Sequence, residues 1–178
     1  MNRAGIDEFE WDIVPLARFH DVRSFDCGED ALNAYLRRFA ERHARQGISK
    51  TYVAFPLQYP SKVIGYVSIS TGAVASEAAV SDQSLPRFPI PVIHTGRLAV
   101  SVEYQNMGVF GPQLLAEVYE IALEFSERVG CHAIDVIAKS ERVKRFYKRQ
   151  GFIELKDDAL HLWIRLKDIR ASNASKSM

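Results

Sequence analysis

The chain has little cysteine and no long apolar segment. Its two cysteines, Cys27 and Cys131, have no partners at metal-ligand spacing, so neither a disulfide scaffold nor a zinc site is expected. No run of ~18 apolar residues is present, which argues against a membrane-spanning helix. The first twelve residues carry four carboxylates, unlike a cleavable secretory signal. We therefore expect a cytoplasmic protein.

An excess of charge of one sign is also absent. The formal charge of +1 argues against a dedicated nucleic-acid binder. Basic residues nevertheless gather in two segments, with five between positions 37 and 50 and six between positions 139 and 149, each beside a single glutamate. Such segments are most often solvated helix faces. Two of them in one small chain also suit a polyanionic ligand, and both interpretations stay open.

The length of 178 residues predicts a single domain, which we place at residues 1–170, followed by a flexible tail at 171–178. Hydrophobic periodicity predicts helices at 27–46, 112–129 and 140–150, the last with Ser140 as its N-cap. Strands are expected at 50–55, 62–71, 92–100, 131–138 and 160–166, with a long connection at 72–91. This order indicates a mixed α/β fold, a central twisted mixed β-sheet flanked by helices.

A glycine-containing loop lies between the strand at 92–100 and the helix at 112–129. Small residues allow successive backbone N–H groups to converge, and the helix that follows adds the positive end of its dipole. A pyrophosphate is the natural ligand of such a loop. Many strand-to-helix turns contain glycine for geometry alone, so the loop by itself leaves a structural role open.

Further motifs surround this loop in a fixed order. They are Gly96-Arg-Leu-Ala-Val100, Tyr104-Gln105-x-x-Gly108, Leu114-Leu115 and Phe146-Tyr147-Lys-Arg-Gln-Gly151-Phe152. With them, residues 93–152 resemble the GNAT N-acetyltransferase superfamily. The N-terminal Phe25-Asp-Cys-Gly28, and the long loop that reaches Pro89, further resemble the acetyltransferase toxins of bacterial toxin–antitoxin pairs.

The resemblance implies acetyl-CoA as cofactor and assigns its site. Tyr147 matches the general acid that protonates the departing thiolate, while a core aromatic is the structural alternative for the same residue. The implied cofactor-binding residues are Leu98, Ala99 and Val100, whose N–H groups would face the oxyanion, the loop residues Gln105, Asn106, Met107, Gly108, Val109, Phe110 and Gly111, and Ser140.

One position departs from the family pattern. Phe110 stands where the phosphate loop usually ends in a small residue, and Pro112 follows it without an N–H. The spacing from Gly111 to the leucine pair is regular if one residue is inserted after Gly108. The sequence therefore predicts a longer phosphate loop, with the helix opening at Gly111 and Pro112.

The resemblance to the toxins implies that the enzyme acetylates the α-amino group of aminoacyl-tRNA and blocks translation. On the predicted helix, Arg38, Arg42 and Arg45 share a face that could hold tRNA phosphates, and the basic residues at 142–149 could add to them. No general base is evident, although His94 and Glu103 lie near the site in sequence.

Two alternatives remain at this point. The enzyme could acetylate a small amine or a protein N-terminus, or the chain could be a non-catalytic CoA-binding module, as Phe110 and Pro112 suggest. The partners implied by the resemblance are aminoacyl-tRNA and a ribbon-helix-helix antitoxin, and a homodimer is compatible with it. No metal is expected.

Overall fold

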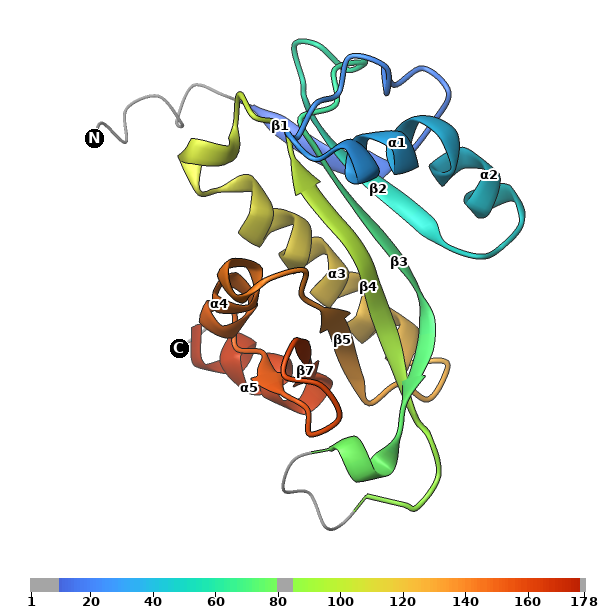
Figure 1. The fold of residues 1–178 in the computed structure, drawn as a ribbon, viewed down its shortest axis with the longest axis vertical. Coiled ribbons are helices and arrows are strands. Elements are labelled where there is room, and N and C mark those ends of the chain that lie inside the picture. Colours follow the sequence, from blue (N-terminus) through green and yellow to red (C-terminus); the bar gives the residue numbers. More distant parts are fainter. Residues whose placement is uncertain (1–9, 80–84, 177–178) are drawn as a thin grey trace. The chain divides into compact units, whose positions relative to one another are not determined.

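The computed structural model describes residues 10–79 and 85–176, which form helices around a seven-stranded sheet (Figure 1). The strands are β1 (Trp11–Pro15), β2 (Lys50–Pro56), β3 (Gly65–Val74), β4 (Ile90–Val100), β5 (Ala133–Ile137), β6 (Ile153–Glu154) and β7 (His161–Arg165), in the spatial order β1-β2-β3-β4-β5-β7-β6. The pair β4–β5 is parallel, whereas β1–β2, β2–β3, β5–β7 and β6–β7 are antiparallel. The predicted mixed α/β fold is confirmed.

The helices are α1 (Asp30–Arg38), α2 (Ala40–Arg45), α3 (Phe110–Ser126), α4 (Glu141–Arg149) and α5 (Leu166–Lys176), with short 3₁₀ helices η2 (Ser76–Ala78) and η3 (Gln105–Met107). Within the described ranges, none of them is long and apolar enough to cross a membrane. The chain divides into two compact units. The first unit contains the residues up to Ile69 and Arg97–Glu117, and the second contains Ser70–Gly96 and the residues from Val118 onward.

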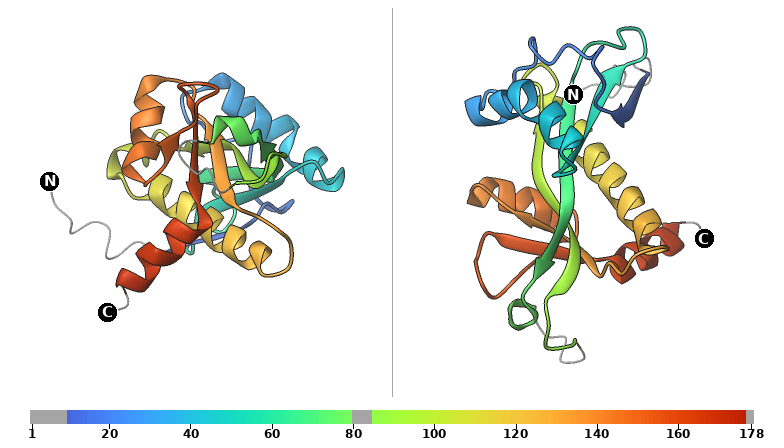
Figure 2. Two further views of the ribbon diagram at one scale, coloured as in Figure 1. Left: turned by 90° about the horizontal axis from the view of Figure 1, so that it is seen from below. Right: turned by 90° about the vertical axis from the view of Figure 1, so that its right-hand side faces the viewer.

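The first unit is built on an aromatic core. Phe25, Tyr35, Leu36 and Tyr66 are almost fully buried, and the rings of Phe25 and Tyr66 meet edge to face at 5.5 Å. Helices α1 and α2 lie on one side of β3 and β4, and the first turns of α3 lie on the other (Figure 2). A Cβ atom at Gly65 would stand 3.0 Å from the side chain of Leu114, so the absence of a side chain at Gly65 allows α3 to approach the sheet closely.

The second unit has its own core around Trp163, which is 1% exposed. Strand β5 pairs along its whole length with β7, and α4 and α5 lie on opposite sides of the strands (Figure 2). Helix α4 begins as predicted, because the Ser140 hydroxyl accepts a hydrogen bond from the N–H of Val143 at 3.4 Å. This bond satisfies one of the N–H groups that lack a partner at a helix start.

The single helix predicted at 27–46 is wrong. The chain forms α1 and α2, separated at Phe39, whose φ and ψ are −119° and −33°. The break allows Ala40 to be fully buried while the arginines at 38, 42 and 45 stay exposed. Strands β1 and β6 and helix α5 were not predicted, and α5 includes most of the segment that the sequence predicted as a tail.

The connection after β3 is shorter than predicted. Strand β3 extends to Val74, and β4 already begins at Ile90. The 3₁₀ helix η2 occupies part of the interval, and residues 80–84 lie outside the described ranges. The predicted long loop at 72–91 is therefore reduced at both ends by continuation of the two strands.

Candidate active site

The loop after β4 is anchored by the side chain of Gln105. Its Nε2 atom donates hydrogen bonds to the carbonyl oxygens of Cys27 and Val100, both at 2.8 Å. The sequence predicted Gln105 as a cofactor-binding residue. In the structure, its amide group connects the loop to the end of β4 and to the segment before α1, so that the side chain acts by positioning the loop.

The backbone of this loop has the form of an anion-binding turn. After η3, Gly108 adopts the left-handed conformation with φ of 68°, and α3 begins two residues later. The N–H groups of Gln105, Met107 and Gly108 bond to carbonyls within the turn. Those at the start of α3 have no preceding helical turn to bond to, and they point out of the helix end together with its positive dipole. This end of the loop suits a phosphate group.

The predicted late start of the helix is wrong. Helix α3 begins at Phe110, and its first intrahelical bond joins the N–H of Gln113 to the carbonyl of Val109 at 3.1 Å. The Phe110 side chain is 3% exposed and meets the rings of Trp11 and Tyr104 edge to face, at 5.2 and 5.6 Å. Pro112 lies in the first helical turn, where an N–H has no intrahelical acceptor and none is lost. Phe110 and Pro112 therefore fit an intact helix start.

The remaining residues predicted for the cofactor lie on both units. The segment Leu98–Val100 forms the end of β4 in the first unit, where Ala99 is buried and its two neighbours are half-buried. Asn106, Met107 and Gly108 are exposed on the same unit. Ser140, which caps α4, belongs to the second unit together with Tyr147. The structure thus brings the strand end and the loop together in one unit and places the predicted acid in the other.

Tyr147 lies in an apolar environment on α4. Its side chain is 4% exposed, and its ring packs against those of Phe146 and Phe152 at 5.1 and 5.3 Å. Burial raises the pKa of the Tyr147 hydroxyl well above its ordinary value. Within the described part of the chain this hydroxyl has no hydrogen-bond partner. The group is therefore protonated at neutral pH, and its proton is not engaged by the protein.

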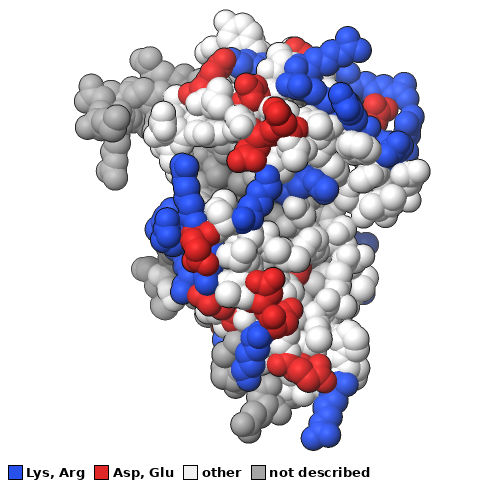
Figure 3. Space-filling model, viewed as in Figure 1, with Lys and Arg blue, Asp and Glu red and all other residues white. Residues whose placement is uncertain are grey.

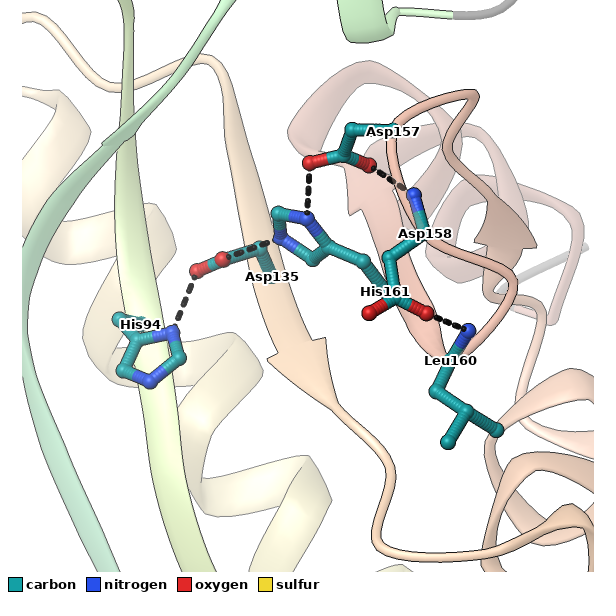
Figure 4. Close-up of polar contacts among 6 residues, drawn as sticks. All are labelled: His94, Asp135, Asp157, Asp158, Leu160 and His161. Carbon is teal, nitrogen blue, oxygen red and sulfur yellow. Dashed lines mark hydrogen bonds and ion pairs between the residues drawn. The ribbon is translucent and has the colours of Figure 1, made fainter.

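A chain of hydrogen bonds in the second unit was not predicted (Figure 4). His94 Nδ1 lies 3.0 Å from one carboxylate oxygen of Asp135, and the other oxygen lies 2.8 Å from His161 Nε2. His161 Nδ1 in turn lies 2.8 Å from Asp157. Burial lowers the pKa of His161, but its bonds to Asp135 and Asp157 outweigh burial and raise it overall. These four residues come from three strands and a loop, so no local sequence pattern could predict their hydrogen bonds.

The two basic segments differ in the structure. Lysine and arginine side chains gather over α1 and α2 (Figure 3), where Arg38 and Arg42 meet no carboxylate within residues 10–79 and 85–176, and Arg45 lies 3.9 Å from Glu41. On α4, Lys144 and Lys148 lie 3.1 and 2.9 Å from Glu154. The kink at Phe39 puts Arg38 on a different helix from the other two arginines, so the single shared helix face is not present.

The mixed sheet, in which β4 and β5 run parallel, and the left-handed Gly108 that leads into α3 form an α/β fold with an anion-binding loop. The model of the acetyltransferase (GNAT) family matches residues 16–152. The chain belongs to this family.

Several relatives are more specific. A tRNA-acetylating toxin of Mycobacterium tuberculosis is 33% identical over 153 residues, which are 85% of this chain and 89% of the relative. The toxin AtaT in complex with acetyl-methionyl-tRNAfMet superposes with a TM-score of 0.85 at 29% identity, over 91% of this chain and 98% of that one. A tyrosine-to-phenylalanine mutant of AtaT, bound to the C-terminus of the antitoxin AtaR and to acetyl-CoA, gives 0.76 at 27% identity, over 91% and 97%.

Proposed function

We propose that this protein is a toxin that uses acetyl-CoA to acetylate the α-amino group of aminoacyl-tRNA, and so blocks translation. The observation that carries this proposal is the 33% identity to a tRNA-acetylating toxin over 85% of the chain. The fold supports it further, because AtaT in complex with acetyl-methionyl-tRNAfMet has nearly the same fold over 91% of this chain.

The residues of the first unit fit acetyl-CoA. The N–H groups of Val109, Phe110 and Gly111 lie where the left-handed turn at Gly108 meets the start of α3, and this arrangement would hold the pyrophosphate. Asn106 and Met107 would contribute the exposed side of the loop, and Ser140, at the start of α4, is the residue of the second unit that would contribute to cofactor binding. The cofactor supplies the acetyl group as a thioester.

Two groups of this chain would act on the reaction. The backbone N–H groups of Leu98, Ala99 and Val100 would stabilise the negative charge on the carbonyl oxygen, and such preorganised donors are usually the largest catalytic contribution. Tyr147 would hold the proton at its hydroxyl and donate it to the thiolate leaving group. The absence of a competing partner for that hydroxyl supports this assignment over a purely structural one.

The acceptor group that we propose is an α-amine. An α-amino group has a pKa of ~8 and is partly neutral near pH 7.5, whereas a lysine ε-amine near 10.4 would depend on a strong base. The exposed arginines Arg38, Arg42 and Arg45 would bind phosphates of the acceptor stem. No described carboxylate forms an ion pair with Arg38 or Arg42, which leaves their charge available.

The partners follow from the same proposal. A toxin of this kind needs a co-expressed antitoxin, which we propose to be a small ribbon-helix-helix protein, and it would act in the cytoplasm, where charged tRNA is present. We also propose a homodimer. Expression of the wild-type protein should stop growth unless the antitoxin is supplied, and sedimentation should give twice the mass of 20.1 kDa.

The decisive experiment measures transfer of labelled acetyl groups from acetyl-CoA to a panel of charged tRNAs. The wild type should label one or more of them, and the label should be released with the amino acid when the ester bond is hydrolysed. Uncharged tRNA is the matched control and should stay unlabelled. Labelling of small amines or peptide N-termini without labelling of any charged tRNA would overturn the proposal in favour of a different acceptor.

A further inference from the structure

Arg97 stands next to the strand end that is proposed to hold the reacting carbonyl. It lies on β4 immediately before Leu98, and its side chain is half-buried. The guanidinium carbon lies 3.8 Å from the centre of the Tyr35 ring. At this distance a guanidinium group stacks on an aromatic face, which restricts the directions in which its N–H groups can point.

The ring that supports Arg97 is itself held in place. Tyr35 is 3% exposed, and its hydroxyl lies 3.0 Å from the Ser49 hydroxyl and 2.8 Å from the Ser68 hydroxyl. Its ring also stacks on Tyr66 with an interplanar angle of 22° and a centroid distance of 6.2 Å. Tyr35 therefore gives Arg97 a rigid surface, and the guanidinium is preorganised before any ligand binds.

Arg97 has no anionic partner among the residues that the structure describes. Across residues 10–79 and 85–176 it forms no ion pair with a carboxylate, whereas Lys62 in the same unit lies 2.7 Å from Glu103. A cation that is partly withdrawn from water without a counter-charge is unfavourable. Such a charge is stabilised when a ligand supplies the anion.

The face on which Arg97 lies indicates the source of that anion. Arg97 and Ala99 are two residues apart on β4 and so share a face, and Ala99 packs in the cluster of Tyr35 and Tyr66 beneath α1. Helix α3, which follows the cofactor loop, packs against Gly65 on the opposite face. Arg97 therefore lies on the face of the sheet that carries α1 and not on the face of the cofactor helix. Helices α1 and α2, which contain the exposed arginines, lie on that same side (Figure 2).

We propose that Arg97 binds a backbone phosphate of the acceptor nucleic acid, close to the 3′ end that carries the amino acid. The proximity of Arg97 to Leu98–Val100 puts this phosphate near the reacting amine. The planar guanidinium can donate two parallel hydrogen bonds to two phosphate oxygens, which a lysine cannot reproduce. This inference rests on the proposed tRNA substrate and deepens it, by adding a binding residue that positions the end of the acceptor.

The test compares two acceptors, a charged tRNA and the same amino acid esterified to adenosine, which has no phosphodiester. For Arg97→Gln, we expect KM for charged tRNA to rise about 10- to 100-fold, the range for loss of hydrogen bonds to a charged group. The slope of log affinity against log salt should flatten by ~0.7–0.9, which corresponds to one phosphate contact. For aminoacyl-adenosine, and for acetyl-CoA, KM should equal the wild-type value.

Two further variants complete the experiment. Arg97→Lys keeps the charge without the planar fork, and its KM for charged tRNA should fall between those of the wild type and Arg97→Gln. Should Arg97→Gln fail to fold, this variant carries the same comparison of the two acceptors. Arg170→Gln removes a cation that already contacts Glu127 and the Ser126 hydroxyl, and it should behave as wild type.

Each contrary outcome has a distinct meaning. An equal rise in KM for both acceptors would show that Arg97 has a structural role. A raised KM for acetyl-CoA would show that Arg97 binds a phosphate of the cofactor. Either result overturns the inference. If the wild type acetylates charged tRNA and Arg97→Gln has the wild-type KM for it, the inference is overturned and the proposed function stands. A wild type that acetylates no charged tRNA overturns the proposed function and this inference together.

Discussion

The two units of this chain use positive charge differently. In the second unit, Lys144 and Lys148 share the carboxylate of Glu154, and the two arginines near α5 contact Asp168 and Glu127. In the first unit, Arg38, Arg42 and Arg97 have no carboxylate partner within the described ranges. Counting basic residues along the sequence treats both clusters alike. Within the described ranges, Glu154 neutralises the two lysines of the second cluster, whereas Arg38 and Arg42 of the first cluster keep a charge that no carboxylate offsets.

The same two units also differ in the reaction steps to which they would contribute. The first contains the anion-binding loop and Arg38, Arg42 and Arg97, which would bind ligands in the proposed reaction. The second contains Tyr147, whose buried hydroxyl would transfer a proton. We therefore expect substitutions in the first unit to change KM, and the substitution of Tyr147 to change kcat.

The largest effect is expected from Tyr147→Phe. This change removes only the hydroxyl and preserves the ring contacts with Phe146 and Phe152. Loss of a general acid should lower kcat by about 10²–10⁴-fold and leave the affinity for acetyl-CoA nearly unchanged. Steady-state kinetics and calorimetry of acetyl-CoA binding check both parts. An unaltered kcat would mean that Tyr147 is a core residue.

The next effect concerns the arginines of α2. The double variant Arg42→Ala, Arg45→Ala should raise KM for charged tRNA. It should also flatten the slope of log affinity against log salt by roughly 1.5 to 2, because each arginine that no longer binds a phosphate reduces the slope by ~0.7–0.9. KM for acetyl-CoA should not change, because the cofactor loop belongs to a different segment. Kinetics at several salt concentrations make the measurement.

The matched control removes two positive charges from the second unit. Arg165 and Arg170 contact Asp168 and Glu127, and the double variant Arg165→Ala, Arg170→Ala should keep the wild-type salt slope. Equal flattening in both double variants would show that net charge alone matters, and the assignment of Arg42 and Arg45 to phosphate binding would then be wrong.

A smaller effect is expected from the carboxylate that neutralises α4. Glu154 Oε1 lies 3.1 Å from Lys144, whose side chain is 11% exposed, whereas Glu141 lies 3.8 Å from the same ammonium. Glu154→Gln should therefore lower the melting temperature more than Glu141→Gln. Hydrogen bonds from Lys148 and Lys144 lower the pKa of Glu154, so this contribution is present above pH 4.5 and is lost as the pH falls through the pKa of the folded state. Thermal unfolding of both variants at neutral and acidic pH tests this difference.

Local patterns were sufficient for the elements around the cofactor loop. Three adjacent elements follow one another in the sequence here: strand β4, the glycine turn and helix α3. Each can be recognised from its apolar spacing or from its glycine. The cap at Ser140 is also local, because its bond spans three residues. For the same reason the mixed α/β fold could be predicted from the order of elements alone.

Contacts between distant segments were not predictable in this way. The break at Phe39 accompanies the burial of Ala40, which depends on the core and not on the helix itself. The Gln105 amide bonds to a carbonyl 78 positions away, and the partners of Asp135 lie 41 and 26 positions away. Phe110 departed from the family pattern in sequence, and its contact with Trp11 of the unpredicted strand β1 explains why a large side chain is accommodated there.

The smallest expected effect is a pH-dependent loss of stability at His161 in the second unit. Asp135 and Asp157 raise the pKa of His161 above its ordinary value of 6.5, so protonated His161 stabilises the fold. Its contribution is complete below about pH 6.5 and is lost as the pH rises through the higher pKa of the folded state. The difference in unfolding free energy between the wild type and His161→Gln, from urea titrations at a series of pH values, should therefore decrease as the pH rises above 6.5. Asp157→Asn keeps the contact between His161 and Asp135, and this variant should show the same trend with a smaller amplitude. If this difference in unfolding free energy does not vary with pH, His161 stays neutral in the folded protein and donates or accepts its hydrogen bonds as an uncharged imidazole.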